Sequence, residues 1–158
     1  MSIPASLEPC RSNHAGHWLR LALERFDARV LELMARHTAA PLGLANLAAR
    51  GQVGAAHIHI TRHLELQGSR LTDLATRAGM TKQAMTTLVN QCEAWGMVER
   101  TDDTSDARAK HIRFTATGLA WLQAYQDAVA QAQDELQQAV GPEVATVIHL
   151  GLEAYCGH

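Results

Sequence analysis

Two short helical patterns separated by a glycine constrain the fold of this chain more than any other feature. Apolar residues recur at positions i, i+3, i+4 and i+7 over residues 71–78 and again over residues 85–92. Thr72 and Thr81 lie where each helix would begin and are candidate capping residues. Gly79 lies between the patterns and can adopt the positive φ that a tight turn needs. Two short helices joined in this way predict a helix-turn-helix.

Two short extended segments follow, at residues 97–102 and 110–115. The polar stretch between them, residues 103–109, contains Asp, Thr and Ser, which do not readily continue a helix. We therefore predict a β-hairpin with a long loop, which would form a small wing beside the helix-turn-helix.

The rest of the chain is dominated by helical patterns. Residues 17–37 have the spacing of an amphipathic helix, and residues 38–53 form a connecting segment to a shorter helical pattern at residues 58–68. A long helix is predicted from about Thr117. It carries a coiled-coil-like seam, which implies a partner helix and consists of Leu122, Tyr125, Val129, Ala132 and Leu136. Gly141 and Pro142 then precede a last short helix with Val144, Val147, Ile148 and Leu152.

Length and composition favour one mainly helical domain. The chain has 158 residues, 47% of them hydrophobic, while aromatic strand formers are scarce at 4%. Its apolar runs are shorter than the roughly 20 residues of a membrane span, and its N-terminus lacks a signal-peptide pattern, so we expect a cytoplasmic protein. No motif of an enzyme, metal site or cofactor site is evident, so we expect none of these. The three cysteines, Cys10, Cys92 and Cys156, fit reduced thiols better than a disulfide framework.

Charge is unevenly distributed along the chain. The net charge of −2 argues weakly against nucleic-acid binding. However, no Lys or Arg occurs after Phe114, whereas acidic residues do occur there. The middle of the chain holds most of its basic residues, interleaved with acids. Any phosphate-binding surface must therefore arise from the geometry of the fold and not from a basic tract.

The second helix of the helix-turn-helix would expose polar side chains suited to DNA. If residues 85–92 turn their apolar positions inward, helix geometry turns outward Lys82, Gln83, Thr86, Thr87 and Asn90. Gln and Asn can pair with adenine, Lys can reach guanine or phosphate, and Thr can contact a thymine methyl group or a phosphate. We add Arg70, Thr81 and Lys110 to this predicted surface. A solvated helix face is the alternative.

The predicted wing contains an arginine that could enter a minor groove. Arg108 lies between Asp106 and Lys110, in a loop that could project beyond the domain. Asp106 could hold its guanidinium group in position. A surface ion pair between Arg108 and Asp106 is the simpler interpretation, and it is compatible with a role of Arg108 in the minor groove.

The span from Leu71 to Gly118 resembles MarR-family transcriptional regulators. The resemblance rests on L-T-x-L-A, G-M-T-K-Q-A-M-T-x-L-V, G-M-V-E-R, D-A-R and F-T-x-x-G, which together cover about a third of the chain. It implies a homodimer with two recognition helices in successive major grooves of a pseudo-palindromic operator and with Arg108, oriented by Asp106, in a minor groove. The implied division is residues 14–50 for an N-terminal dimerisation helix and connector, 54–115 for the winged region, and 116–158 for C-terminal dimerisation helices. Ala107 departs from the basic residue common at this position.

The resemblance also implies a small effector, commonly an aromatic carboxylate or phenol, that releases a repressor from DNA. Transferred to this chain, the effector cleft would be lined by Trp18, His57, His59 and Arg62. Three alternatives remain: a redox response through Cys10, a metal response through His59 and His63, and a winged-helix module that binds proteins.

Overall fold

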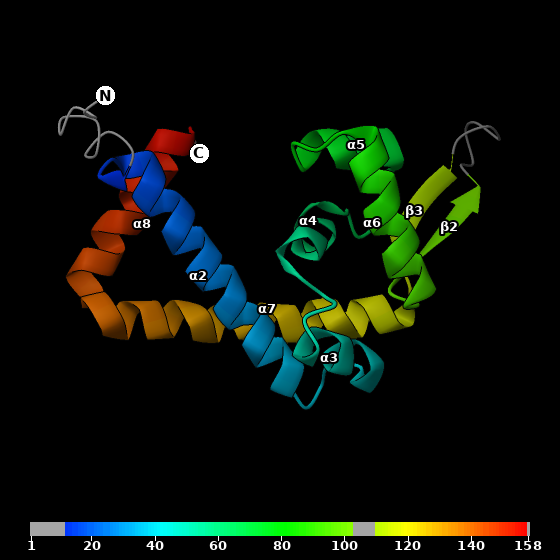
Figure 1. Cartoon of the computed structure of the whole chain (residues 1–158), viewed down its shortest axis with the longest axis horizontal. Coiled ribbons are helices and arrows are strands. Elements are labelled where there is room, and N and C mark those ends of the chain that lie inside the picture. The colour runs from blue at the N-terminus through cyan, green and yellow to red at the C-terminus, as the bar shows by residue number, and fades with distance from the viewer. Residues whose placement is uncertain (1–11, 103–109, 158) are drawn as a thin grey trace, which may run out of the picture.

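The computed structural model describes residues 12–102 and 110–157. Helices dominate it, and a small sheet completes it, as the sequence predicts (Figure 1). In chain order the elements are α2 (Ala15–Arg36), α3 (Leu42–Ala49), α4 (Ala55–His63), β1 (Ser69–Arg70), α5 (Leu71–Arg77), α6 (Lys82–Ala94), β2 (Val98–Asp102), β3 (Lys110–Phe114), α7 (Ala116–Val140) and α8 (Pro142–Cys156). None of the helices in the described residues combines the length and apolar content needed to cross a membrane.

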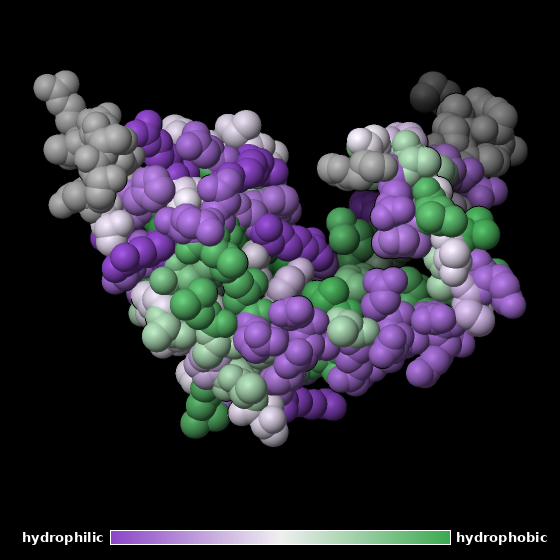
Figure 2. All heavy atoms as spheres, turned by 180° about the vertical axis from the view of Figure 1, so that it is seen from behind, coloured by the Kyte–Doolittle hydropathy of each residue, from purple (hydrophilic) through white to green (hydrophobic). Residues whose placement is uncertain are grey.

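The elements form two parts joined by α7 (Figure 1). The winged-helix lobe consists of α4, α5, α6 and the three strands. The helical arm consists of the N-terminal half of α2, the C-terminal half of α7, and α8. Helix α7 begins beneath the lobe and ends in the arm, and the space-filling view shows a notch between the two parts (Figure 2).

The sheet has three antiparallel strands in the order β1-β3-β2. The predicted hairpin is confirmed: β2 and β3 pair from Val98 opposite Phe114 to Asp102 opposite Lys110. Strand β1 was not predicted, because two residues are too few to show a strand pattern and only pairing with β3 defines them. The turn before β1 needs Gly68, which has a φ of 94° and whose Cβ would lie 2.9 Å from the carbonyl oxygen of Ile112.

The two helices of the predicted helix-turn-helix are α5 and α6. Gly79 lies in the turn with a φ of 63°, and the Oγ1 of Thr81 accepts a hydrogen bond from the Ala84 N–H at 3.2 Å, so both assignments are confirmed. The prediction that Thr72 caps α5 is wrong. The chain passes directly from β1 into α5, so the helix begins at Leu71 and its cap position is Arg70, which makes no side-chain capping bond.

Residues 38–53 contain a helix that the sequence analysis missed. Pro41 and the nearby glycines suggested a connector, but Pro41 immediately precedes α3, where a proline suits the start of a helix. Gly51, with a φ of 69°, follows its end. The short helix is stable because Leu44 and Ala45 are buried in the core shared with α2.

The predicted seam on α7 also needs correction. The buried stripe is formed by Gly118, Trp121, Ala124, Ala128 and Ala132, so only Ala132 belongs to both sets. Leu122, Tyr125 and Val129 lie half-buried on its flank, and Leu136 is exposed. The expected partner helix is α2 of the same chain. Alanines bring α2 and α7 close together, and a pattern of large apolar residues does not reveal such a contact.

Gly118 fixes the start of α7 against the sheet. A Cβ at this position would overlap the carbonyl oxygen of Met97 and lie 2.9 Å from Cδ1 of Phe114. We expect Gly118→Ala to lower the free energy of unfolding by at least about 2 kcal/mol, because backbone must move to admit the methyl group. Gly43→Ala is the control, since nothing lies within 4 Å of its Cβ in α3, and it should be neutral or stabilise by up to about 1 kcal/mol. Urea denaturation compares them, and equal effects would contradict this account.

Candidate nucleic-acid interface

Helix α6 has the two faces that the sequence predicts. Its inward face is buried and consists of Met85, Leu88, Val89 and Cys92. Its outward face consists of the exposed residues Lys82, Gln83, Thr87 and Asn90, with Thr86 half-exposed. This face forms a polar surface on the winged-helix lobe, and we call it the recognition face.

The two threonines of the recognition face direct their hydroxyl protons into the helix. Thr86 Oγ1 donates to the carbonyl oxygen of Lys82 at 2.7 Å, and Thr87 Oγ1 donates to that of Gln83 at 3.2 Å. A hydroxyl that donates in this way has no second proton for a phosphate oxygen. In this arrangement the threonines can offer methyl groups to thymine but no donated hydrogen bond to the DNA backbone.

Asn90 is held by a strand of the wing. Its Oδ1 accepts a hydrogen bond from Nη2 of Arg100 at 2.6 Å, and Arg100 also pairs with Glu93. A bidentate contact with adenine needs both the oxygen and the nitrogen of the carboxamide. Because Arg100 already occupies one lone pair of Oδ1, this bond restricts how the carboxamide of Asn90 can approach adenine. Arg100 is a residue of the site that the sequence analysis did not select.

The remaining predicted contact residues lie at the edges of this surface. Thr81 uses its hydroxyl oxygen to cap α6, and half-buried Arg70 ends β1 opposite His111. Lys110 begins β3 opposite Asp102. Asp106 and Arg108 lie outside the described residues.

Acids accompany several basic side chains of the lobe. Arg113 Nε lies 2.7 Å from Glu99 Oε1 across the hairpin. Arg77 pairs with Glu65 and bonds to Ser69, and Arg100 pairs with Glu93 as described above. A phosphate group would have to compete with a carboxylate at each of these arginines. The interleaving of charges in the sequence therefore persists in space.

The four predicted effector residues lie in different surroundings. Trp18 is 56% exposed on the arm, where its Nε1 donates to Asn13 Oδ1 at 3.4 Å. His57 is buried in the lobe: its Nδ1 accepts from the Gly54 N–H at 3.0 Å, so Nε2 is the donor to Gln91 Oε1 at 2.9 Å. Both nitrogens of His57 are thus occupied, and its ring centroid lies 4.8 Å from that of Trp95.

His59 and His63 share one face of α4, as their spacing predicts. Their ring centroids are 5.9 Å apart, with an interplanar angle of 14°. Burial lowers the pKa of His63 from its ordinary value, and the charges of His59, Arg62 and Arg77 lower it further. Within residues 12–102 and 110–157 no three metal-binding side chains come together.

An open apolar groove lies between the end of α4 and the middle of α7. Its volume is about 450 Å³, and its lining consists of Leu64, Leu66, Leu122, Tyr125, Gln126 and Val129. Arg62 adjoins it, because its Nε donates to the Tyr125 hydroxyl oxygen at 3.0 Å. Part of the predicted α7 seam therefore lines a groove. The apolar spacing of Leu122, Tyr125 and Val129, which the sequence analysis interprets as a helix-pairing seam, is the sequence signal for this groove.

The cysteines differ in their surroundings. Cys92 is buried in the core of the lobe, and this burial raises the pKa of its thiol to about 12, which disfavours the reactive thiolate. Cys156 is exposed at the end of α8. Cys10, the predicted redox residue, lies outside the described residues.

Comparison with known sequences finds a family likeness in the winged-helix region. A sequence model of the MarR family matches residues 53–109, which span the helix-turn-helix and β2, the first strand of the hairpin. The likeness to the MarR family therefore covers about a third of the chain. No curated protein matches the chain significantly.

Solved structures share the fold of this chain over nearly its full length. The transcriptional repressor CouR, in a structure bound to a 23-mer DNA duplex, has a TM-score of 0.68 and 21% identity, covering 100% of this chain and 99% of that one. Wild-type MarR from E. coli in its apo form has a TM-score of 0.64 and 18% identity, with coverage of 89% and 96%. YusO from Bacillus subtilis has a TM-score of 0.60 and 14% identity, with coverage of 99% and 100%. These similarities establish the winged helix-turn-helix fold.

Proposed function

We propose that this chain is a homodimeric, sequence-specific DNA-binding regulator of the MarR family that represses transcription. The observation that carries the proposal is the recognition face: α6 exposes polar and basic side chains beside a β-hairpin, while its apolar side is buried. A helix of this kind fits the major groove, where Gln and Lys can distinguish base pairs. A protein-binding module would instead expose apolar anchor residues on this face.

The helical arm supports the dimer. Helix α8 has no buried residue, and one of its sides carries an apolar stripe of Val144, Val147, Ile148, Leu152 and Tyr155. Val147 is 69% exposed and Tyr155 is 82% exposed. A second copy of the chain would remove this stripe from water. In the resulting dimer, two α6 helices about 34 Å apart would meet successive major grooves on one side of the duplex.

DNA recognition is tested by removing one amide from the recognition face. The operator is first obtained by selection from random duplexes. We expect Gln83→Ala to weaken operator binding by about 5- to 150-fold, the equivalent of one lost base contact, and to leave binding to random DNA unchanged. Fluorescence anisotropy near physiological salt measures both affinities.

Gln123→Ala on α7 provides the matched control, since it removes an exposed amide outside the lobe and should bind as the unaltered chain does. Failure of the selection to enrich any sequence would contradict the regulator. Wild-type affinity of Gln83→Ala would remove this residue from the interface. Arg108→Ala examines the wing in the same assay, where a reduced affinity is expected.

Dimerisation is tested on the apolar stripe. We expect Val147→Glu to convert the dimer to a monomer at micromolar concentration, because a charge would be buried without a partner in the interface. Thr146→Glu is the control: this exposed residue lies on the opposite side of α8, beside His149 and Glu153. Sedimentation velocity distinguishes the two states. A dimeric Val147→Glu variant would show that the interface lies elsewhere.

We further propose that a small aromatic carboxylate or phenol releases the regulator from DNA by binding in the groove beside Tyr125. The groove is lined mainly by leucine, valine and tyrosine side chains, and the Tyr125 hydroxyl and Arg62 supply polar groups at its edge. Of the four residues first predicted to bind an effector, only Arg62 lies beside it.

The effector site is tested by filling the groove. We expect 2-hydroxybenzoate or 4-hydroxybenzoate to release the operator from the unaltered protein. Leu122→Trp should raise the concentration needed at least about tenfold, because the indole would occupy the groove. Leu119→Trp, at an exposed position of the same helix, should respond normally. Anisotropy titrations measure release, and an unchanged response of Leu122→Trp would contradict this location.

A further inference from the structure

An ion pair with a buried carboxylate and a partly exposed guanidinium joins the winged-helix lobe to α2. Asp27 is the only buried carboxylate in the part of the chain that the structure describes, with 5% of its surface exposed. Its partner is Arg62 of α4: Nη2 bonds to Oδ1, and Nη1 lies 3.4 Å from Oδ2. A buried carboxylate that loses its partner strongly destabilises a protein. The fold therefore has a strong preference for the position of α4 that keeps this pair together.

The same turn of α4 is also bonded to α7. Nε of Arg62 donates to the Tyr125 hydroxyl oxygen at 3.0 Å, so one guanidinium group contacts both long helices. The preceding residue, Thr61, accepts a buried hydrogen bond from Nε1 of Trp121 at 3.3 Å. Burial opposes the charge of Arg62, but its bonds to Asp27 and Tyr125 outweigh this effect and raise its pKa. A planar guanidinium with three directed bonds fixes an angle as well as a distance.

This joint lies between the two parts that would determine operator geometry. The lobe carries α6 and the arm carries α8 (Figure 1), and the apolar stripe of α8 is exposed. In a dimer held by the arms, a small rotation of each lobe about the joint changes the separation of the two recognition helices. We propose that Arg62, held by Asp27 and Tyr125, is a positioning residue that determines which spacing between DNA half-sites the dimer accepts. This inference rests on the proposed function.

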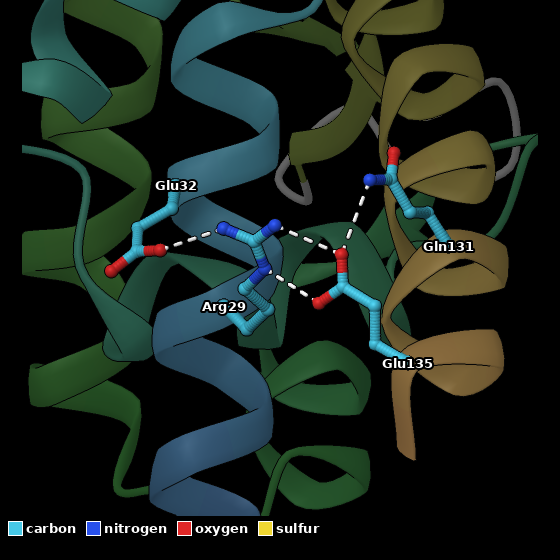
Figure 3. A network of polar contacts seen from close by, with 4 residues as sticks. All are labelled: Arg29, Glu32, Gln131 and Glu135. Atoms are coloured by element: carbon cyan, nitrogen blue, oxygen red, sulfur yellow. Dashed lines mark hydrogen bonds and ion pairs between the residues drawn. The ribbon is translucent and has the colours of Figure 1, made fainter. Parts of the chain in front are cut away.

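A second arginine cluster provides a matched control. Arg29 of α2 makes two bonds to Glu135 of α7, at 2.7 and 2.8 Å, and a third to Glu32 at 2.9 Å, while Gln131 also donates to Glu135 (Figure 3). Hydrogen bonding to Arg29 lowers the pKa of Glu135. This cluster also joins α2 to α7 but includes no residue of the lobe. Its loss should affect stability and leave the lobe angle unchanged.

The test measures binding to duplexes in which the selected half-sites keep their sequence and the spacer between them changes by one or two base pairs. We expect the unaltered dimer to prefer its selected spacing by at least about tenfold. The double variant Asp27→Leu, Arg62→Met replaces the ion pair with apolar groups of similar size, which keeps the fold without the directed bonds. Its preference should fall to about threefold or less, with binding to random DNA unchanged.

Two further variants keep the result interpretable. Tyr125→Phe removes a single hydrogen bond and should reduce the spacing preference in the same direction but less, even if the double variant fails to fold. Arg29→Met should retain the full preference. Wild-type preference in both the double variant and Tyr125→Phe would overturn the proposal, and so would a loss of preference in Arg29→Met.

A DNA-independent measurement separates this proposal from the proposed function. Spin labels at Asp73→Cys in α5 and Thr146→Cys in α8, with Cys10 and Cys156 replaced by serine, report the lobe-to-arm distance within one chain when diluted into unlabelled protein. The distance distribution should be narrow in the parent and broader in the double variant. If the distance distribution broadens in the double variant but the selection yields no operator, the proposed DNA recognition is refuted and the joint is retained. An unchanged distribution would refute the joint.

Discussion

The close approach of α7 to the sheet is the contact on which the rest of the structure depends. The backbone of Gly118 lies against the carbonyl group of Met97, so near that no other residue fits without displacing backbone. Thr115 reinforces this junction, because its hydroxyl oxygen caps α7 by accepting a hydrogen bond from the Gly118 N–H at 3.1 Å. Since α7 continues for 25 residues into the arm, its direction at this junction sets where the arm lies relative to the lobe.

The joint at Arg62 complements that junction. Gly118 fixes the start of α7 against the sheet, and Arg62 fixes α4 to both α2 and α7 a few turns further along. The first contact is made by backbone and tolerates no change, whereas the second is made by side chains whose bonds can exchange. The apolar groove beside Tyr125 adjoins the second contact. A ligand there would touch the side chains that hold α4 to both long helices, and it could shift the position of the lobe only by favouring one arrangement over another.

The recognition face illustrates how tertiary contacts restrict what a sequence pattern allows. The pattern predicted five outward polar residues, and all five lie at the surface or partly exposed. The structure then distinguishes among them. Asn90 is engaged by Arg100 from a strand ten residues away, and Thr86 and Thr87 bond to their own helix. Lys82 and Gln83, in the first turn of α6, are the strongest candidates for direct base contacts.

Local sequence patterns are sufficient to predict most of the helices and the hairpin of this protein. The helix-turn-helix, the hairpin, the long helices and the outward face of α6 follow from periodicity and capping residues, which act within a few positions of the chain. Features that depend on distant partners cannot be predicted in this way, because they form only when the chain is folded. Pairing with β3 creates β1, burial against α2 stabilises α3, and alanines instead of leucines form the buried stripe of α7. The Asp27 and Arg62 pair joins residues 35 positions apart, and no local pattern encodes such a contact.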